Sequence, residues 1–223
     1  MWYMNLRKAT RKEFPMSQLI ACKNVNGIVL ATDGKAVDFD PSGEMIELKV
    51  DRLVQISQHT AILTGGAADG VEMCHSLRNF LKEEGLDDIQ EVYGASLPFL
   101  STEFERFMRK RCEILPVDPI HHVYFVLAGY TAKDPQHPFH LHLLWTKKKL
   151  PQLDGDEISF AYTAPRIMGL EYKLNQLCRE NAPLDHILPE IKKGMEKLEK
   201  TQEEIGPPFS YAFITKSGFL KVE

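Results

Sequence analysis

The chain has 223 residues, 43% of them hydrophobic and 26% charged, a composition ordinary for a globular protein that buries a core. Its net charge of −4 lacks the basic excess of nucleic-acid-binding proteins, and no apolar run approaches the roughly 18 residues that cross a bilayer. No apolar segment follows the basic start of the chain, as a secretory signal would require. We therefore expect a cytoplasmic protein that binds neither nucleic acid nor membrane.

The first predicted element is a β-hairpin over residues 19–34. Two apolar runs flank the sequence Asn24-Val25-Asn26-Gly27, which is typical of a tight turn. Residues 45–64 predict further short strands. Apolar side chains then recur at helical spacing over residues 71–81, and Gly85 is typical of the residue that follows a helix C-terminus.

The remaining predicted elements are a second helix, a further series of strands, two more helices and a final hairpin. A helix is expected over residues 87–113, with a kink or a break at Pro98. The remaining predicted elements are strands at 121–130, 139–145 and 158–162, helices at 168–180 and 184–203, and a hairpin over 210–222 that turns at Ser217-Gly218.

The order of these elements predicts the fold class. Neither helical pair lies between successive strands as a βαβ crossover, which argues against a parallel sheet. Two antiparallel sheets packed face to face, each with a helical layer outside, fit the order better. We expect an α+β fold, a four-layer αββα sandwich, with residues 17–223 as one domain behind an N-terminal extension or propeptide over residues 1–16.

Ser17, Asp33 and Lys49 stand out because each lies sixteen residues after the last. Such positions can converge at one end of a sheet that begins with a hairpin. A serine hydroxyl needs a base before it becomes a good nucleophile, a lysine can stabilise the alkoxide, and a carboxylate can orient the ammonium. An α-amino group, with a pKa of roughly 7.7–8.0, is a better base at neutral pH than a lysine.

Four segments at this spacing resemble the start of proteasome β-type subunits: SQLIACK from Ser17, NGIVLATDGKA from Asn26, KVDRL from Lys49 and TGGAAD from Thr64. The chain is especially similar to the peptidase of the bacterial ATP-dependent two-component protease, and the similarity covers residues 17–84. The resemblance implies an N-terminal-nucleophile (Ntn) hydrolase without a metal or an organic cofactor. It gives a nucleophile, a carboxylate, a lysine and an oxyanion N–H donor at Ser17, Asp33, Lys49 and Gly65.

The activity that the resemblance implies is hydrolysis of peptide amide bonds by Ser17 once residues 1–16 are absent. The substrate would be a peptide or a protein. Because the relatives work as rings, a homo-oligomeric ring is expected, and an ATPase unfoldase partner is left open.

Three departures from the family pattern leave a second function open. The nucleophile position holds Ser instead of Thr, Met16 stands where self-cleaving precursors have Gly, and Gln202–Ile205 lacks the family's Asp-x-x-Ser. Translation from Met16, followed by removal of that methionine, would expose Ser17 without self-cleavage. The alternative is a catalytically inactive, proteasome-like structural subunit whose N-terminus stays blocked.

The histidine-rich segment over residues 137–142 contains three histidines, as a metal site could, but a different interpretation is favoured. Strand alternation puts Phe139 and Leu141 on one face and His140 and His142 on the other, so a packed or solvated strand face is expected. The four cysteines are far apart in the sequence, and we expect reduced thiols.

Overall fold

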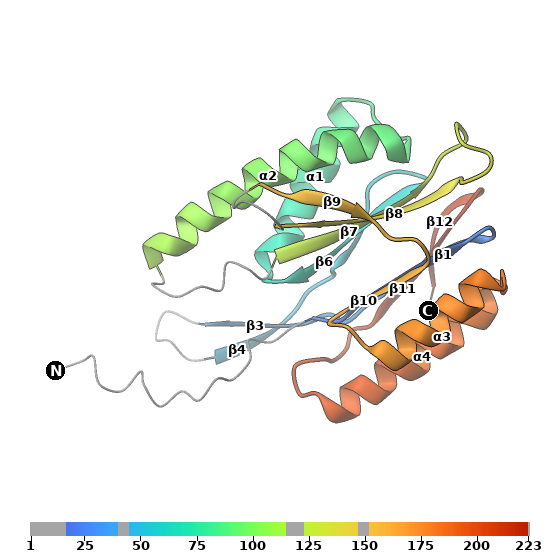
Figure 1. Cartoon of the computed structure of the whole chain (residues 1–223). Helices are drawn as coiled ribbons and strands as arrows, with labels where there is room; N and C mark the ends of the chain where they lie inside the picture. The colour runs from blue at the N-terminus through green and yellow to red at the C-terminus, as the bar shows by residue number, and fades with distance from the viewer. Residues whose placement is uncertain (1–16, 40–44, 115–122, 147–151, 223) are drawn as a thin grey trace.

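Two five-stranded antiparallel sheets face each other at the centre of the molecule (Figure 1). The computed structural model describes residues 17–39, 45–114, 123–146 and 152–222, so the predicted N-terminal extension lies outside the described residues. Among these residues there are four helices and three antiparallel sheets. The predicted α+β class is therefore confirmed.

The first sheet is built on the hairpin predicted near the start of the chain. Its strands, in spatial order, are β10 (Ala161–Ala164), β1 (Leu19–Asn24), β2 (Gly27–Thr32), β11 (Ser210–Thr215) and β12 (Gly218–Val222). Pairing runs from Leu19↔Thr32 to Asn24↔Gly27, which leaves a two-residue turn as predicted. Gly27 has a φ of +147°, and a Cβ there would lie 2.5 Å from the Ile214 carbonyl oxygen, so the turn requires glycine.

The second sheet follows the sequence order of its strands. These are β5 (Leu53–Gln55), β6 (Thr60–Gly66), β7 (Val123–Tyr130), β8 (Phe139–Trp145) and β9 (Asp154–Glu157). A separate two-stranded sheet, β3 (Lys35–Phe39) with β4 (Met45–Lys49), extends from the body of the molecule on the left of Figure 1. Strand β3 was not predicted from the sequence.

One pair of helices covers the outer face of each sheet (Figure 1). The helices are α1 (Asp69–Glu83), α2 (Ile89–Ile114), α3 (Met168–Arg179) and α4 (Leu184–Thr201). Along α1, Met73, Cys74, Leu77 and Leu81 are buried at helical spacing against the second sheet, as their period predicted. Within the described residues, no helix has both the length and the apolar character needed to cross a membrane.

The strands of the first hairpin are buried on both faces, which explains their continuous apolar sequence. Leu19 and Ile28 pack between the two sheets, whereas Ile20 and Val29 pack under α3 and α4. This alternation fixes the register of the hairpin, because a slip of one residue would exchange the two sets. The ends of β1 and β2, where Ser17 and Asp33 lie, are therefore firmly placed.

Two predicted elements differ from the structure. Residues 154–157 and 161–164 are strands, whereas a single strand was predicted over 158–162. The reason is that the chain crosses here from β9 in one sheet to β10 in the other. Helix α2 continues through Pro98, where a kink or a break was predicted. Pro98 has no N–H to donate to the Gly94 carbonyl, and both residues are exposed, so that carbonyl is not buried without a partner.

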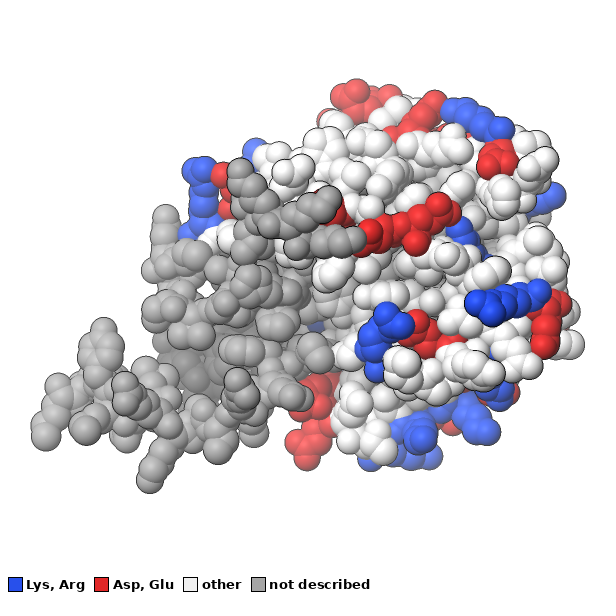
Figure 2. All heavy atoms as spheres, viewed as in Figure 1, with Lys and Arg blue, Asp and Glu red and all other residues white. Residues whose placement is uncertain are grey.

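Charged side chains of both signs are interspersed on the face shown in Figure 2. That face carries no field of a single sign of the kind that attracts a polyanion.

Candidate functional site

Ser17 and Asp33 lie together at the open end of the β1–β2 hairpin. The Gln18 N–H donates to Asp33 Oδ1 at 2.8 Å, and the Asp33 N–H donates to the Gln18 carbonyl oxygen at 3.3 Å. The other carboxylate oxygen accepts the Gly206 N–H at 3.4 Å. Both Ser17 and Asp33 are buried, at 2% and 0% exposed. The hairpin thus pairs Asp33 with Gln18, the residue that directly follows the predicted nucleophile Ser17.

Burial is the main influence on the Asp33 carboxyl and raises its pKa to about 6. The N–H of Gln18 opposes this effect most, followed by the charge of Arg52 and the N–H groups of Gly206 and Lys35. A carboxyl with a pKa near 6 is ionised at neutral pH and becomes protonated under mildly acidic conditions. Perturbed groups of this kind are more frequent at functional sites than elsewhere.

The Ser17 hydroxyl accepts the Gly66 N–H at 2.9 Å. Gly66 ends strand β6 with a φ of +89°, a conformation that favours glycine. The predicted oxyanion donor, Gly65, is the residue before it and pairs with Tyr124 across the sheet. The backbone N–H that the structure brings to the Ser17 oxygen is therefore that of Gly66, one residue further along.

Tyr124 closes this end of the sheet. Its hydroxyl shares one hydrogen between the carbonyl oxygens of Ser17, at 3.4 Å, and Ala164, at 3.3 Å. Its ring leaves no room for a side chain at Gly65, because a Cβ there would lie 2.4 Å from the Tyr124 ring. Burial raises the pKa of Tyr124 well above its usual range, so the hydroxyl stays protonated and can donate.

Lys49 lies apart from this cluster. It pairs across the β3–β4 ladder with Lys35, and its side chain is exposed while Ser17 and Asp33 are buried. Directly opposed residues share one face of a sheet, and on that face Lys35 Nζ contacts Glu47 at 2.8 Å. Within the described part of the chain, the Lys49 side chain makes no hydrogen bond or ion pair with Ser17 or Asp33.

A buried arginine, Arg52, contacts Gly66, the residue whose N–H meets the Ser17 oxygen. Arg52 is 2% exposed; its Nη1 donates to the Gly66 carbonyl oxygen at 3.0 Å, and its Nη2 lies 3.5 Å from the Lys35 carbonyl oxygen. Sequence reasoning missed it, although alternation within KVDRLV puts Arg52 on the same strand face as the core residue Val54. Ser17, Asp33, Arg52 and Gly66 are called the Ser17 site below.

The charge of Arg52 is balanced by that of Asp33. Burial lowers the pKa of Arg52, and the negative charge of Asp33 is the largest influence in the opposite direction. Among the described side chains, no ion pair within 4 Å joins Arg52 and Asp33, so their charges favour each other without direct contact.

The predicted alternation of the histidine strand is confirmed. Phe139 and Leu141 are buried between the sheets, whereas the His142 ring stacks on Tyr93 of α2 at 4.0 Å. His140 Nδ1 lies 3.5 Å from the Glu157 carboxylate. Across the described ranges, no group of three or more His, Cys, Asp or Glu side chains could hold a metal ion.

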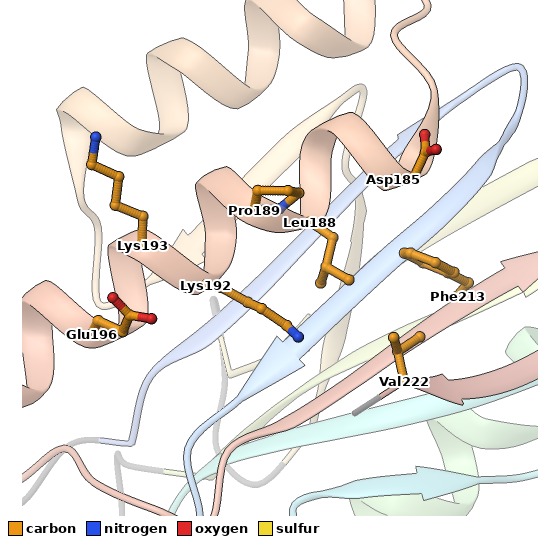
Figure 3. Close-up of a pocket in the computed structure, with 8 residues that line it drawn as sticks. All are labelled: Asp185, Leu188, Pro189, Lys192, Lys193, Glu196, Phe213 and Val222. Atoms are coloured by element: carbon orange, nitrogen blue, oxygen red, sulfur yellow. The ribbon is translucent and has the colours of Figure 1, made fainter.

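A shallow groove of about 490 Å³ lies between α4 and the β11–β12 hairpin (Figure 3). Leu188, Pro189, Phe213 and Val222 give it apolar walls, and charged groups of both signs flank them. The Lys192 ammonium lies over the Tyr211 ring, 5.1 Å from its centroid. Apolar walls with balanced charges define no ligand, and the groove includes no residue of the Ser17 site.

Comparison of the chain with known proteins adds no assignment. No protein-family model matches it, and no curated protein matches it. A function therefore has to be inferred from the residues and contacts of the Ser17 site.

Proposed function

We propose that this chain is a proteasome-like Ntn hydrolase that cleaves peptide amide bonds with Ser17 as its N-terminal nucleophile. The proposal includes the four-layer αββα sandwich of that superfamily. Three successive cores support it: one between α1–α2 and the second sheet, one between the sheets, and one between the first sheet and α3–α4.

The observation that carries the proposal is the hydrogen bond between the Gly66 N–H and the Ser17 oxygen, with the buried Asp33 and Arg52 bound to the residues next to that contact. Ser17 lies beside a buried carboxylate, its oxygen is 2.9 Å from the Gly66 N–H, and the charge of Arg52 is buried nearby. A hydroxyl, a carboxylate, a cation and an oriented N–H are the groups that acyl transfer by a nucleophile requires.

The proposed reaction begins with the free α-amine of Ser17. The amine takes the proton of the hydroxyl as the oxygen attacks the substrate carbonyl, and the Gly66 N–H stabilises the developing oxyanion. The ammonium then gives its proton to the leaving amine, which yields an acyl-enzyme. Water attacks the ester while the amine accepts its proton, the bond between the acyl carbon and Ser17 Oγ breaks, and the ammonium returns the proton to Oγ as the carboxylic acid product leaves.

The catalytic role of Lys49 stays a prediction within this proposal. The Lys49 side chain is exposed, whereas the Ser17 hydroxyl is buried. The exposure of Lys49 favours the second candidate function, a structural subunit of a proteasome-like ring that has lost catalysis. For both functions we propose a cytoplasmic homo-oligomeric ring. A peptide or protein substrate and an ATPase unfoldase partner belong to the enzyme alone.

The two functions are separated by the state of the Ser17 amine. The full-length chain has an amide at that position and is expected to be inert, whereas a chain produced from Met16 is expected to mature to Ser17 and hydrolyse peptide amides. Mass spectrometry of the N-terminus establishes maturation, and an epoxyketone that requires both the hydroxyl and the amine is expected to label Ser17. A chain with a confirmed Ser17 terminus that resists labelling would favour the structural subunit, and equal turnover of both chains would contradict the terminal-amine mechanism.

A further inference from the structure

Arg52 reaches Ser17 through Gly66. The same residue, Gly66, is held on both sides: its N–H donates to Ser17 Oγ at 2.9 Å, and its carbonyl oxygen accepts from Arg52 Nη1 at 3.0 Å. The N–H belongs to the peptide group before Gly66 and the carbonyl to the one after it, so the guanidinium holds the peptide that directly follows the N–H donor.

Arg52 also reaches the carboxylate side of the site. Its charge acts on Asp33, whose Oδ1 accepts the N–H of the residue that follows Ser17. The ionisable groups that face Asp33 are Arg52 and Tyr124, and those that face Arg52 are Asp33, Tyr124 and Cys74. Arg52 is the cation in this set.

The hydrogen bonding of Arg52 argues against a role in packing alone. Within the described residues its Nε is buried and has no hydrogen-bond partner. Buried donors are normally paired, and an unpaired one in a native structure calls for an explanation. An apolar side chain would fill this space without the cost of burying a charge.

We propose that Arg52, instead of Lys49, is the positioning cation of the Ser17 site. It holds the peptide that follows Gly66, next to the N–H that meets the Ser17 hydroxyl, and supplies a buried positive charge that favours the ionised form of Asp33. Arg52 acts through these two groups and does not touch the substrate. The inference rests on the proposed function for its catalytic meaning, and on the contacts of Arg52 with Gly66 and Lys35 for its place beside Ser17 and Asp33.

Arg52→Met tests this coupling directly, because methionine fills a similar length without a charge. The Asp33 titration, followed by carboxyl carbon NMR in the whole chain, is expected to move to higher pH by about one unit or more. In the Ser17-initiated chain, turnover is expected to fall at least about tenfold, since the N–H donor is no longer held. The low-pH limb of the activity profile is expected to move with Asp33.

Arg109→Met is the matched control, since Arg109 is an exposed arginine on α2 paired only with Glu105 among the described contacts. It is expected to leave the Asp33 titration in place. Lys49→Met tests the rival cation. An Asp33 titration that moves in Lys49→Met and not in Arg52→Met would overturn the proposal.

Arg52→Lys keeps the inference testable if Arg52→Met does not fold. Lysine retains the charge but cannot hold Gly66 and Lys35 with a planar fork. The Asp33 titration is therefore expected to stay near that of the wild type while turnover falls. Wild-type turnover in Arg52→Lys would contradict the positioning role.

The two proposals can fail separately. A Ser17-initiated wild type without turnover or labelling would contradict the proposed function, and the Asp33 titration would still decide whether Arg52 is its cation. An active wild type whose Asp33 titration does not move in Arg52→Met would leave the hydrolase standing and overturn the role of Arg52.

Discussion

The Tyr124 ring packs directly over Gly65, so that a Cβ at residue 65 would lie 2.4 Å from the ring and 2.6 Å from its hydroxyl oxygen. The two residues are opposite each other in the β6–β7 ladder. Because the Tyr124 hydroxyl also donates to the Ser17 carbonyl oxygen, the ring is held against the glycine on the side where the nucleophile lies.

Gly65→Ala is therefore expected to destabilise the protein by about 1–3 kcal/mol, the usual cost of overpacking a filled site. Displacement of the Tyr124 ring should also lower any Ser17-dependent turnover. The matched control is Gly94→Ala on the exposed face of α2, where a Cβ meets no atom within 4 Å. It should stabilise the helix by up to about 1 kcal/mol. Equal denaturant midpoints for the two variants would contradict the contact with Tyr124.

The titration of Asp33 makes the stability of the protein depend on pH. The unfolded carboxyl releases its proton near pH 3.9 and the native one near pH 6, so the native state holds the extra proton in between. The contribution of Asp33 to stability therefore falls as pH rises from about 4 to 6, by about 3 kcal/mol for a difference of two pH units. Asp33→Asn should remove this fall in a series of denaturant titrations. An unchanged slope in the variant would contradict the raised pKa.

His142 acts in the opposite direction over nearly the same interval. Burial against Tyr93 lowers its pKa to about 4, whereas an unfolded histidine has a pKa of roughly 6.5. The unfolded state binds the extra proton between these values, so stability is lost as pH falls from about 6.5 to 4. His142→Phe keeps a ring on Tyr93 and should remove this acid loss. In the wild type the effects of Asp33 and His142 partly cancel, and each single variant should reveal the other.

The sequence predicts the scaffold of the Ser17 site better than its charges. The β1–β2 hairpin and its turn follow from local signals, two apolar runs and the turn sequence from Asn24 to Gly27, and register is then fixed by burial on both faces. These features suffice to bring Ser17 and Asp33 together. The neighbouring Gly65-Gly66 pair is also evident from sequence, because a tight segment before a helix favours glycine.

The exposure of the two cations depends mainly on how their strands pair. Lys49 is exposed in the two-stranded β3–β4 sheet, where it lies opposite Lys35, and β3 was not predicted from the sequence. Arg52 is buried because β5 enters the second sheet one residue later, with Leu53 against one core and Val54 against the other. Both outcomes are set by tertiary contacts, which the sixteen-residue spacing of Ser17, Asp33 and Lys49 does not include.

The Ser17 hydroxyl has two separable roles, in stability and in chemistry. Its oxygen is the partner of the buried Gly66 N–H, and Ser17→Ala leaves that donor unpaired at a cost of about 1–3 kcal/mol. In the Ser17-initiated chain the same change should lower turnover at least about 10³-fold, because the attacking oxygen is gone.

Ser96→Ala is the matched control: it removes a hydroxyl that is equally buried and donates to the Val92 carbonyl oxygen within α2. Comparable loss of stability in both variants, with loss of turnover confined to Ser17→Ala, would separate the nucleophile from the hydrogen bond. Loss of turnover in proportion to stability in both would show that Ser17 serves only the fold, and the structural subunit would then be the better description of the chain.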